Sequence, residues 1–99
     1  MRFLLPLAFL LVLSIEIHAQ KVIRIACVGN SITYGAGLTH REQNSFPAQL
    51  QYLLGSGYTV MNFGVSGRTV LRETTAPYIS TDSYQEALKS NPDIVLIKL

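Results

Sequence analysis

The chain has 99 residues, of which 14% are charged, and its formal net charge is +2. That length accommodates at most one small domain. The eight Lys and Arg residues are scattered along the chain, so no basic stripe indicates nucleic acid as a partner.

The first 19 residues have the layout of a secretory signal peptide. Arg2 provides an early cation, an apolar stretch runs from Phe3 to Leu13, and the small residue Ala19 ends a more polar tail. The apolar stretch is shorter than the roughly 20 residues that a membrane-spanning helix needs. A buried N-terminal helix or a retained membrane anchor is the alternative. We predict export to a secreted or periplasmic location, cleavage near Ala19 and no stable membrane anchor, which leaves a domain of residues 20–99.

The first predicted strand covers residues 21–28, KVIRIACV, which are β-branched and almost continuously apolar. Such a run is typical of a strand that is buried on both faces. Cys27 lies in this run and is the only cysteine of the chain, so it has no partner for an intrachain disulfide. A lone buried thiol ordinarily packs as a small apolar side chain. Because Cys and His lack the spacing of a metal site, we expect neither a metal ion nor another cofactor.

A helix is predicted next, within residues 44–57, NSFPAQLQYLLGSG. Ser45 or Asn44 provides a cap at its start, Pro47 suits its first turn, and Gly55 or Gly57 ends it. The apolar face is expected to consist of four residues at helical spacing, namely Phe46, Leu50, Leu53 and Leu54.

Two further strands and a second helix complete the predicted elements. A short strand covers residues 58–63, and Pro77 prevents the loop after it from ending in a regular helix. In the helix predicted within residues 80–93, Ser83 and Glu86 have capping-box spacing and Asn91-Pro92 marks the end. Residues 93–99, DIVLIKL, form a third strand of the buried type. The apolar face of the second helix is expected to consist of Tyr84, Ala87 and Leu88.

The predicted order is strand, helix, strand, helix, strand. Right-handed crossovers through the helices give an α/β fold with a doubly wound, flavodoxin-like parallel sheet in three α/β/α layers. With three strands, that sheet is incomplete in this chain. The loops at the carboxyl ends of such strands form the working surface. GNSIT (29–33) follows the first strand and GVSG (64–67) the second, so we expect both at one edge.

Ser31 directly follows the first strand, in the segment IACVGNSITYG of residues 25–35. A serine at a strand-to-helix junction is exposed, and the free backbone N–H groups there can hold an oxyanion. Asn30, Ser31 and Thr33 are also typical helix caps, and the loop alone favours a cap over a nucleophile. The segment lacks the lysine of a P-loop, and Thr33 replaces the final glycine of G-x-S-x-G.

Three segments resemble the SGNH or GDSL hydrolase superfamily. VGNSITYG (28–35) is similar to the signature G-D-S-[IL]-T-x-G, NFGVSGRT (62–69) to the second block, and PDIVLIKL (92–99) to the strand that leads into the third. The resemblance spans residues 22–99 and implies the N-terminal part of a hydrolase domain. The chain departs from the signature at Asn30, where the family has Asp, and this makes the local charge less negative.

The resemblance implies a serine esterase that works through an acyl-serine intermediate. Ser31 then is the nucleophile, and the backbone N–H groups of Ser31 and Gly67 are two donors of the oxyanion hole. GNSITYG and SGRT resemble members that remove acetyl groups from carbohydrates, so the expected substrate is a small-molecule or carbohydrate ester. Arg68 is a candidate contact for a polar or anionic sugar, and equally a candidate for a surface ion pair.

A catalytic base does not accompany Ser31 in this sequence. The family's third-block Asn and its D-x-x-H pair are not among these residues, and His40 is expected to be an exposed loop residue. Without a base, a serine hydroxyl is a poor nucleophile, so the chain by itself is expected to be inactive. The alternatives to an esterase are a noncatalytic carbohydrate- or anion-binding module and a truncated, inactive fragment.

Overall fold

The computed structural model of the chain describes residues 20–72 and 75–99, so the predicted signal peptide of residues 1–19 lies outside it. Within these residues, no helix is long and apolar enough to span a membrane. In chain order the elements are β1 (Ile23–Gly29), α2 (Ser31–Tyr34), α3 (Arg41–Asn44), α4 (Phe46–Leu54), β2 (Tyr58–Gly64), the 3₁₀ helix η1 (Tyr78–Ser80), α5 (Asp82–Lys89) and β3 (Ile94–Lys98).

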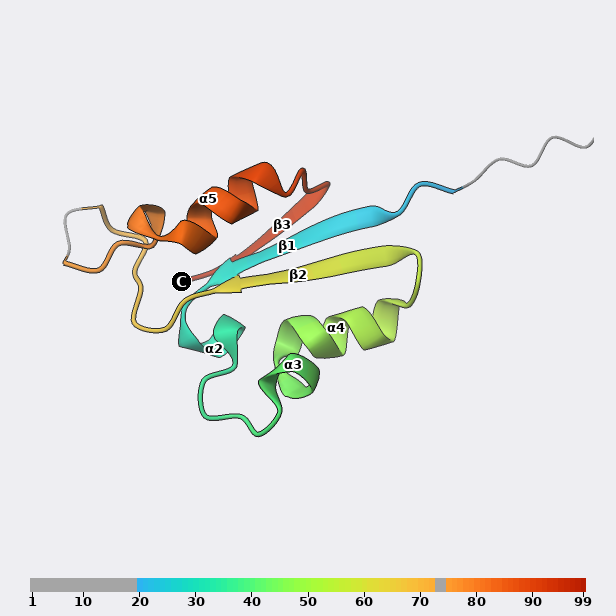
Figure 1. Cartoon of the computed structure of the whole chain (residues 1–99), viewed down its shortest axis with the longest axis horizontal. Helices are drawn as coiled ribbons and strands as arrows, with labels where there is room; N and C mark the ends of the chain where they lie inside the picture. Colours follow the sequence, from blue (N-terminus) through green and yellow to red (C-terminus); the bar gives the residue numbers. More distant parts are fainter. Residues whose placement is uncertain (1–19, 73–74) are drawn as a thin grey trace, which may run out of the picture.

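The three strands form one parallel sheet with β1 in the middle, in the order β2-β1-β3. At the carboxyl edge, Gly29 of β1 lies beside Gly64 of β2 and Lys98 of β3. All three strands therefore end at the edge where α2 and the loop after β2 begin (Figure 1). The prediction of a parallel α/β sheet of the flavodoxin-like type is confirmed for this part of the fold.

Helices lie on both sides of the sheet, as a doubly wound fold requires. Figure 1 shows α2, α3 and α4 on one side and α5 with η1 on the other. The side chains of β1 from Ile25 to Val28 are buried between these two layers. Cys27 is fully buried, and burial raises the pKa of its thiol to about 11. The interpretation of Cys27 as a core residue is therefore confirmed.

The ends of α4 are formed by two residues that the sequence identifies. Ser45 Oγ accepts a hydrogen bond from the Ala48 N–H at 3.4 Å, and Gly55 ends the helix with a φ of 79°. Glycine adopts this left-handed φ without strain, which makes it a good helix stop. The predicted apolar face is right for Phe46, Leu50 and Leu54, which are half-buried, and wrong for Leu53, which is 77% exposed because no described element covers that side of α4.

The start of α5 differs from the prediction. Thr81 caps the helix, because its Oγ1 accepts a hydrogen bond from the Tyr84 N–H at 3.1 Å, and Asp82 is the first helical residue. The predicted capping box of Ser83 and Glu86 is therefore wrong. The chain is extended at Thr81 and already helical at Ser83, where a side chain no longer faces the unpaired N–H groups of the first turn.

The apolar face of α5 packs around Tyr78 of η1. Ala87 is buried, and the half-buried Tyr84 meets the Tyr78 ring edge to face, with centroids 6.1 Å apart. The Tyr78 hydroxyl donates to the Phe63 carbonyl, and burial, with a smaller effect of the Glu86 charge, raises its pKa to about 12. Leu88, predicted on the same face, is 59% exposed, so the prediction is wrong for this residue.

The strand β3 pairs with β1, but all of its residues are exposed. Its sequence predicts a strand buried within a sheet. Among the residues that the structure describes, no further strand pairs with the outer edge of β3. The burial that its apolar sequence predicts is therefore absent from this part of the fold.

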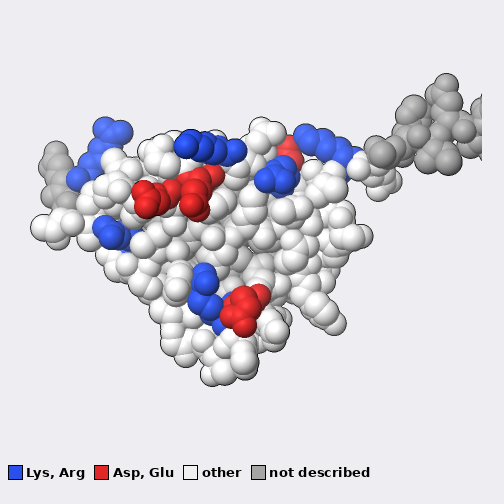
Figure 2. Space-filling view, in the orientation of Figure 1, with Lys and Arg blue, Asp and Glu red and all other residues white. Residues whose placement is uncertain are grey.

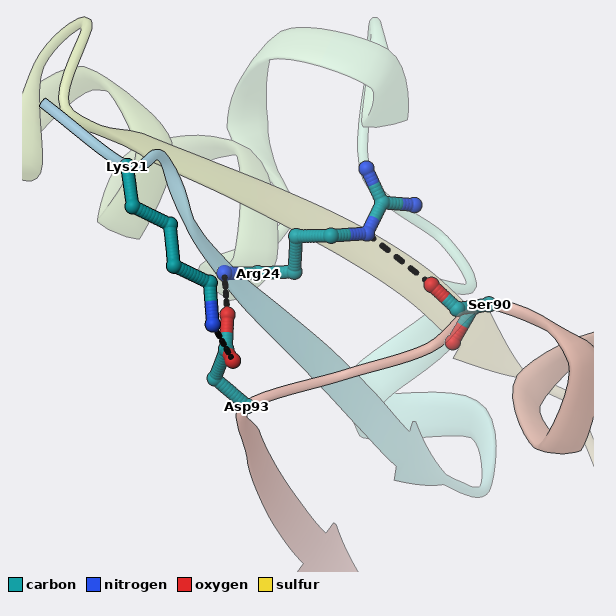
Figure 3. Close-up of polar contacts among 4 residues, drawn as sticks. All are labelled: Lys21, Arg24, Ser90 and Asp93. Carbon is teal, nitrogen blue, oxygen red and sulfur yellow. Dashed lines mark hydrogen bonds and ion pairs between the residues drawn. The ribbon is translucent and has the colours of Figure 1, made fainter. Parts of the chain in front are cut away.

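A polar clamp joins the segment before β3 to the start of β1 (Figure 3). Asp93 accepts hydrogen bonds from Lys21 Nζ at 2.8 Å and from the Arg24 N–H at 2.9 Å. Arg24 Nε in turn donates to the Ser90 carbonyl at 2.9 Å. The hydrogen bond from Lys21, and after it that from Arg24, lowers the pKa of Asp93. The clamp therefore links segments 66 to 72 positions apart and favours the ionised carboxylate.

Replacing Asp93 with asparagine is expected to lower the melting temperature of the full-length protein at neutral pH. A carboxyl group whose pKa is lowered by folding stabilises the fold at pH values above its pKa in the unfolded chain, which is about 4 for Asp. That contribution is lost as the pH falls through the lower pKa of the folded state. Asp93→Asn and the parent should therefore melt closer together at about pH 3 than at about pH 7.

The measurement is thermal denaturation followed by circular dichroism at low ionic strength, because salt screens exposed charge pairs. The Lys21 side chain is 79% exposed, so added salt should also reduce the difference between the two proteins. An equal difference in melting temperature at both pH values would contradict the stabilising role of the Asp93 carboxylate.

Candidate active site

Ser31 lies at the carboxyl edge of the sheet, at the first position of α2. Asn30 turns the chain out of β1, and its N–H donates to the Lys98 carbonyl of β3 at 3.2 Å. Asn30 is also the cap of α2, because its Oδ1 accepts a hydrogen bond from the Ile32 N–H at 3.3 Å. Of the three candidate caps, Asn30 is therefore the residue that caps α2, and the Ser31 side chain does not take part in the cap.

Among the described residues, the Ser31 hydroxyl and backbone N–H have no partner, whereas the Ser31 carbonyl accepts hydrogen bonds from the Gly35 and Ala36 N–H groups. The Ser31 side chain is half-buried, and its hydroxyl has no hydrogen-bond partner in residues 20–72 and 75–99. In the same part of the chain, the backbone N–H groups of Ser31 and Gly67 have no acceptor either. Unpaired N–H groups of this kind are the donors from which oxyanion holes are built.

Gly67 lies in the loop that leaves β2 at the same edge. Its φ is 78°, and a Cβ at this position would have no atom of the described residues within 4 Å. The backbone conformation, rather than crowding, therefore requires glycine. The start of this loop is bonded to the end of β1, since the Val65 N–H donates to the Gly29 carbonyl at 2.9 Å. The loops after β1 and β2 therefore meet at one edge, as the sequence predicts.

The helix α2 rests directly on the ends of two strands. A Cβ on Gly64 would lie 2.2 Å from the Tyr34 backbone nitrogen, and a Cβ on Gly29 would lie 2.0 Å from Thr33 Oγ1. Thr33 is fully buried in this contact, and its hydroxyl is the one buried side-chain polar group without a partner among the described residues. Glycine at both strand ends permits this close approach.

Two side chains that the sequence analysis did not single out hold α2 in place. Asn62 Nδ2 donates to the Thr33 carbonyl at 2.8 Å. Arg41 Nε donates to the Tyr34 carbonyl at 2.7 Å, and its guanidinium lies 3.7 Å from the centroid of the Tyr34 ring. The spacing N-x-G at residues 62–64 is a signal for a local turn, whereas nothing in the sequence pairs Arg41 with Tyr34.

Among the described residues, no hydrogen bond joins His40 or Arg68 to Ser31. His40 is exposed, as expected, and its Nδ1 lies 3.7 Å from Glu42 Oε1. Arg68 is half-buried and forms no ion pair with a described residue. Figure 2 shows basic and acidic side chains interspersed on one face of the molecule, with no broad basic patch. No group of three or more His, Cys, Asp or Glu residues in the described chain is placed to hold a metal ion.

Comparison with known families identifies the relatives of this site. The GDSL-like lipase/acylhydrolase family matches residues 27–99, which include the Ser31 turn, the Gly67 loop and β3. The chain belongs to this family. The resemblance inferred from VGNSITYG, NFGVSGRT and PDIVLIKL is thereby confirmed. In this GDSL-like chain, Ser31 follows β1 at the carboxyl edge of the sheet.

One relative of this GDSL-like chain is named as an acetylxylan esterase, from Xylanibacter ruminicola. It is 49% identical over 86 residues, which cover 87% of this chain and 18% of the relative. The chain therefore spans less than a fifth of that protein's length. No solved structure gives a significant match.

Proposed function

We propose that this chain is the N-terminal part of an exported serine esterase, which hydrolyses carboxylic esters through an acyl-Ser31 intermediate. The observation that carries the proposal is the cap of α2. Because Asn30 supplies it, the Ser31 hydroxyl remains unengaged at the edge where the Gly67 loop begins. Membership in the GDSL-like lipase/acylhydrolase family supports the same chemistry.

In the proposed reaction, Ser31 Oγ attacks the ester carbonyl carbon while a base removes the hydroxyl proton. The N–H groups of Ser31 and Gly67 stabilise the negative charge that develops on the carbonyl oxygen. The intermediate then expels the alcohol, which takes the proton from the base, and acyl-Ser31 remains. Water, activated by the same base, attacks the acyl group and releases the acid and the free Ser31 hydroxyl.

We place the base in a segment of the protein outside this chain. His40 is the one histidine of residues 20–99, and its imidazole lies beside Glu42 on an exposed surface. The length of the relative, of which this chain spans 18%, is consistent with such a segment. The Ser31 turn and the Gly67 loop then supply the nucleophile and the oxyanion donors, and the remainder of the protein supplies the proton acceptor.

An acetylated carbohydrate is the substrate class we propose, because the relative is named as an acetylxylan esterase. Purified full-length protein is expected to release acetate from acetylated xylan and to hydrolyse p-nitrophenyl acetate faster than p-nitrophenyl octanoate. Acetate release and p-nitrophenol absorbance measure the two reactions. Binding of acetylated xylan without release of acetate would instead support a noncatalytic binding module.

Export is proposed from the signal-peptide layout of residues 1–19. The mature protein then begins near Gln20. N-terminal sequencing of protein recovered from the culture medium or the periplasm tests this part of the proposal, and a retained Met1 would contradict it.

A further inference from the structure

The side chain of Asn62 bridges the two segments that carry Ser31 and Gly67. Asn62 lies on β2 (Tyr58–Gly64), on the side of the sheet that α2 covers. Its Nδ2 donates to the Thr33 carbonyl of α2 at 2.8 Å, with the Tyr34 carbonyl 3.5 Å away. Its Oδ1 accepts a hydrogen bond from the Gly64 N–H at 2.9 Å. One amide group therefore binds α2 with its donor end and the end of β2 with its acceptor end.

The position of Ser31 depends on how α2 is seated. A helix of four residues has almost no stability of its own, so tertiary contacts set its orientation. On one side, α2 packs so closely on Gly64 that there is no room for a Cβ. Gly64 also begins the loop to Gly67. A shift of α2 relative to Gly64 would therefore change the position of Ser31 relative to Gly67.

We propose that Asn62 is a positioning residue for ester hydrolysis, which sets the Ser31 nucleophile against the Gly67 oxyanion donor by clamping α2 to the end of β2. This inference rests on the proposed function. Asn62 acts through the Thr33 carbonyl and the Gly64 N–H, and it contacts neither the substrate nor the reacting atoms. It should therefore affect the rate of the chemical step more than substrate binding, because reacting groups must be placed to within about 1 Å.

The chain contains a matched control for the Asn62 contacts. Gln51 of α4 also uses both ends of its amide: Nε2 donates to the Tyr58 carbonyl at 2.8 Å and Oε1 accepts from the Val60 N–H at 2.7 Å. It joins α4 to the start of β2, at the opposite end of the strand from Gly64. Gln51→Glu therefore removes the same kind of side-chain amide donor from a contact between a helix and β2, at the end of the strand away from Ser31.

The test compares Asn62→Asp with Gln51→Glu and Ser31→Ala in the full-length protein, assayed with p-nitrophenyl acetate at about pH 8, where a carboxyl group is ionised. Asn62→Asp keeps the acceptor for the Gly64 N–H, removes the Nδ2 donor to the Thr33 carbonyl together with its weaker contacts to the Tyr34 carbonyl and Ser45 Oγ, and adds a negative charge. It is expected to lower kcat and kcat/KM together by roughly 10- to 100-fold, with KM within about threefold of the parent. Gln51→Glu should leave kcat within about twofold of the parent, even if its melting temperature falls as much as that of Asn62→Asp.

A second variant, Asn62→Ser, removes the donor to α2 without adding a charge, and the same loss of kcat is expected. If Ser31→Ala abolishes hydrolysis while both folded Asn62 variants keep the parental kcat, the inference is wrong and the proposed function stands. Hydrolysis that persists in Ser31→Ala would instead overturn the proposed function. If neither Asn62 variant folds, or if Gln51→Glu loses as much kcat, Asn62 serves the fold in general and the inference is also overturned.

Discussion

Replacing Ser31 with alanine in the full-length protein is expected to lower kcat for p-nitrophenyl acetate by a factor on the order of 10⁴–10⁶. The acyl-enzyme cannot form without the Ser31 hydroxyl. Folding should be preserved, because that hydroxyl bonds to no described residue and Asn30, rather than Ser31, caps α2. Initial-rate kinetics with circular dichroism of both proteins measure the two effects.

Ser66→Ala is the matched control, since Ser66 is an exposed serine in the loop after β2 at the same edge of the sheet. It should keep nearly the parental kcat. A folded Ser31→Ala variant with more than about a tenth of the parental activity would exclude Ser31 as the nucleophile.

Replacing Gly67 with alanine is expected to lower kcat by a factor on the order of 10²–10³, the cost of losing one oxyanion donor. Alanine at this position could act through crowding by neighbouring atoms or through backbone strain, and the structure distinguishes these two causes. No described atom lies within 4 Å of an added Cβ, so crowding by the protein does not contribute. The φ of 78° disfavours alanine, so the backbone is expected to shift and to displace the Gly67 N–H.

Gly55→Ala controls for backbone strain in this experiment. Gly55 has a φ of 79° and equally open surroundings, but it ends α4 at the opposite end of β2 from the Gly67 loop. Both variants should therefore lose a similar amount of stability, whereas only Gly67→Ala should lose kcat. A kcat for Gly67→Ala within about threefold of the parent would make Gly67 a turn residue without a role in catalysis.

The fold was predictable where the local sequence determines the structure. The apolar run of β1 and the residues Ser45 and Gly55 at the ends of α4 are local signals that the structure confirms. The prediction for the start of α5 was wrong because Thr81 and Ser83 are both suitable caps, and the dihedral angles of the chain select between them. The exposure of Leu53 could not be predicted either, since helical spacing shows which residues share a face of α4 but not how much of that face other elements cover.

The candidate site was only partly predictable, for a related reason. Asn30 and Ser31 are adjacent cap residues, so the sequence alone could not show which of them caps α2 and which is free. The contacts of Asn62 with Thr33 and of Arg41 with Tyr34 depend on how α2 packs on the sheet. Asn62 and Thr33 are 29 positions apart, and no local pattern connects them.

The central claim is that Ser31 forms a covalent bond with the substrate acyl group, and the most direct measurement is the site of a trapped adduct. A fluorophosphonate ester reacts with an activated serine by forming an oxygen–phosphorus bond and releasing fluoride, while the base takes the proton. After the full-length protein is inhibited and digested, mass spectrometry should find one adduct, on the peptide that contains Ser31. The Ser31→Ala variant should remain unmodified. An adduct on another residue, or undiminished hydrolysis by a protein whose Ser31 is fully modified, would contradict the account.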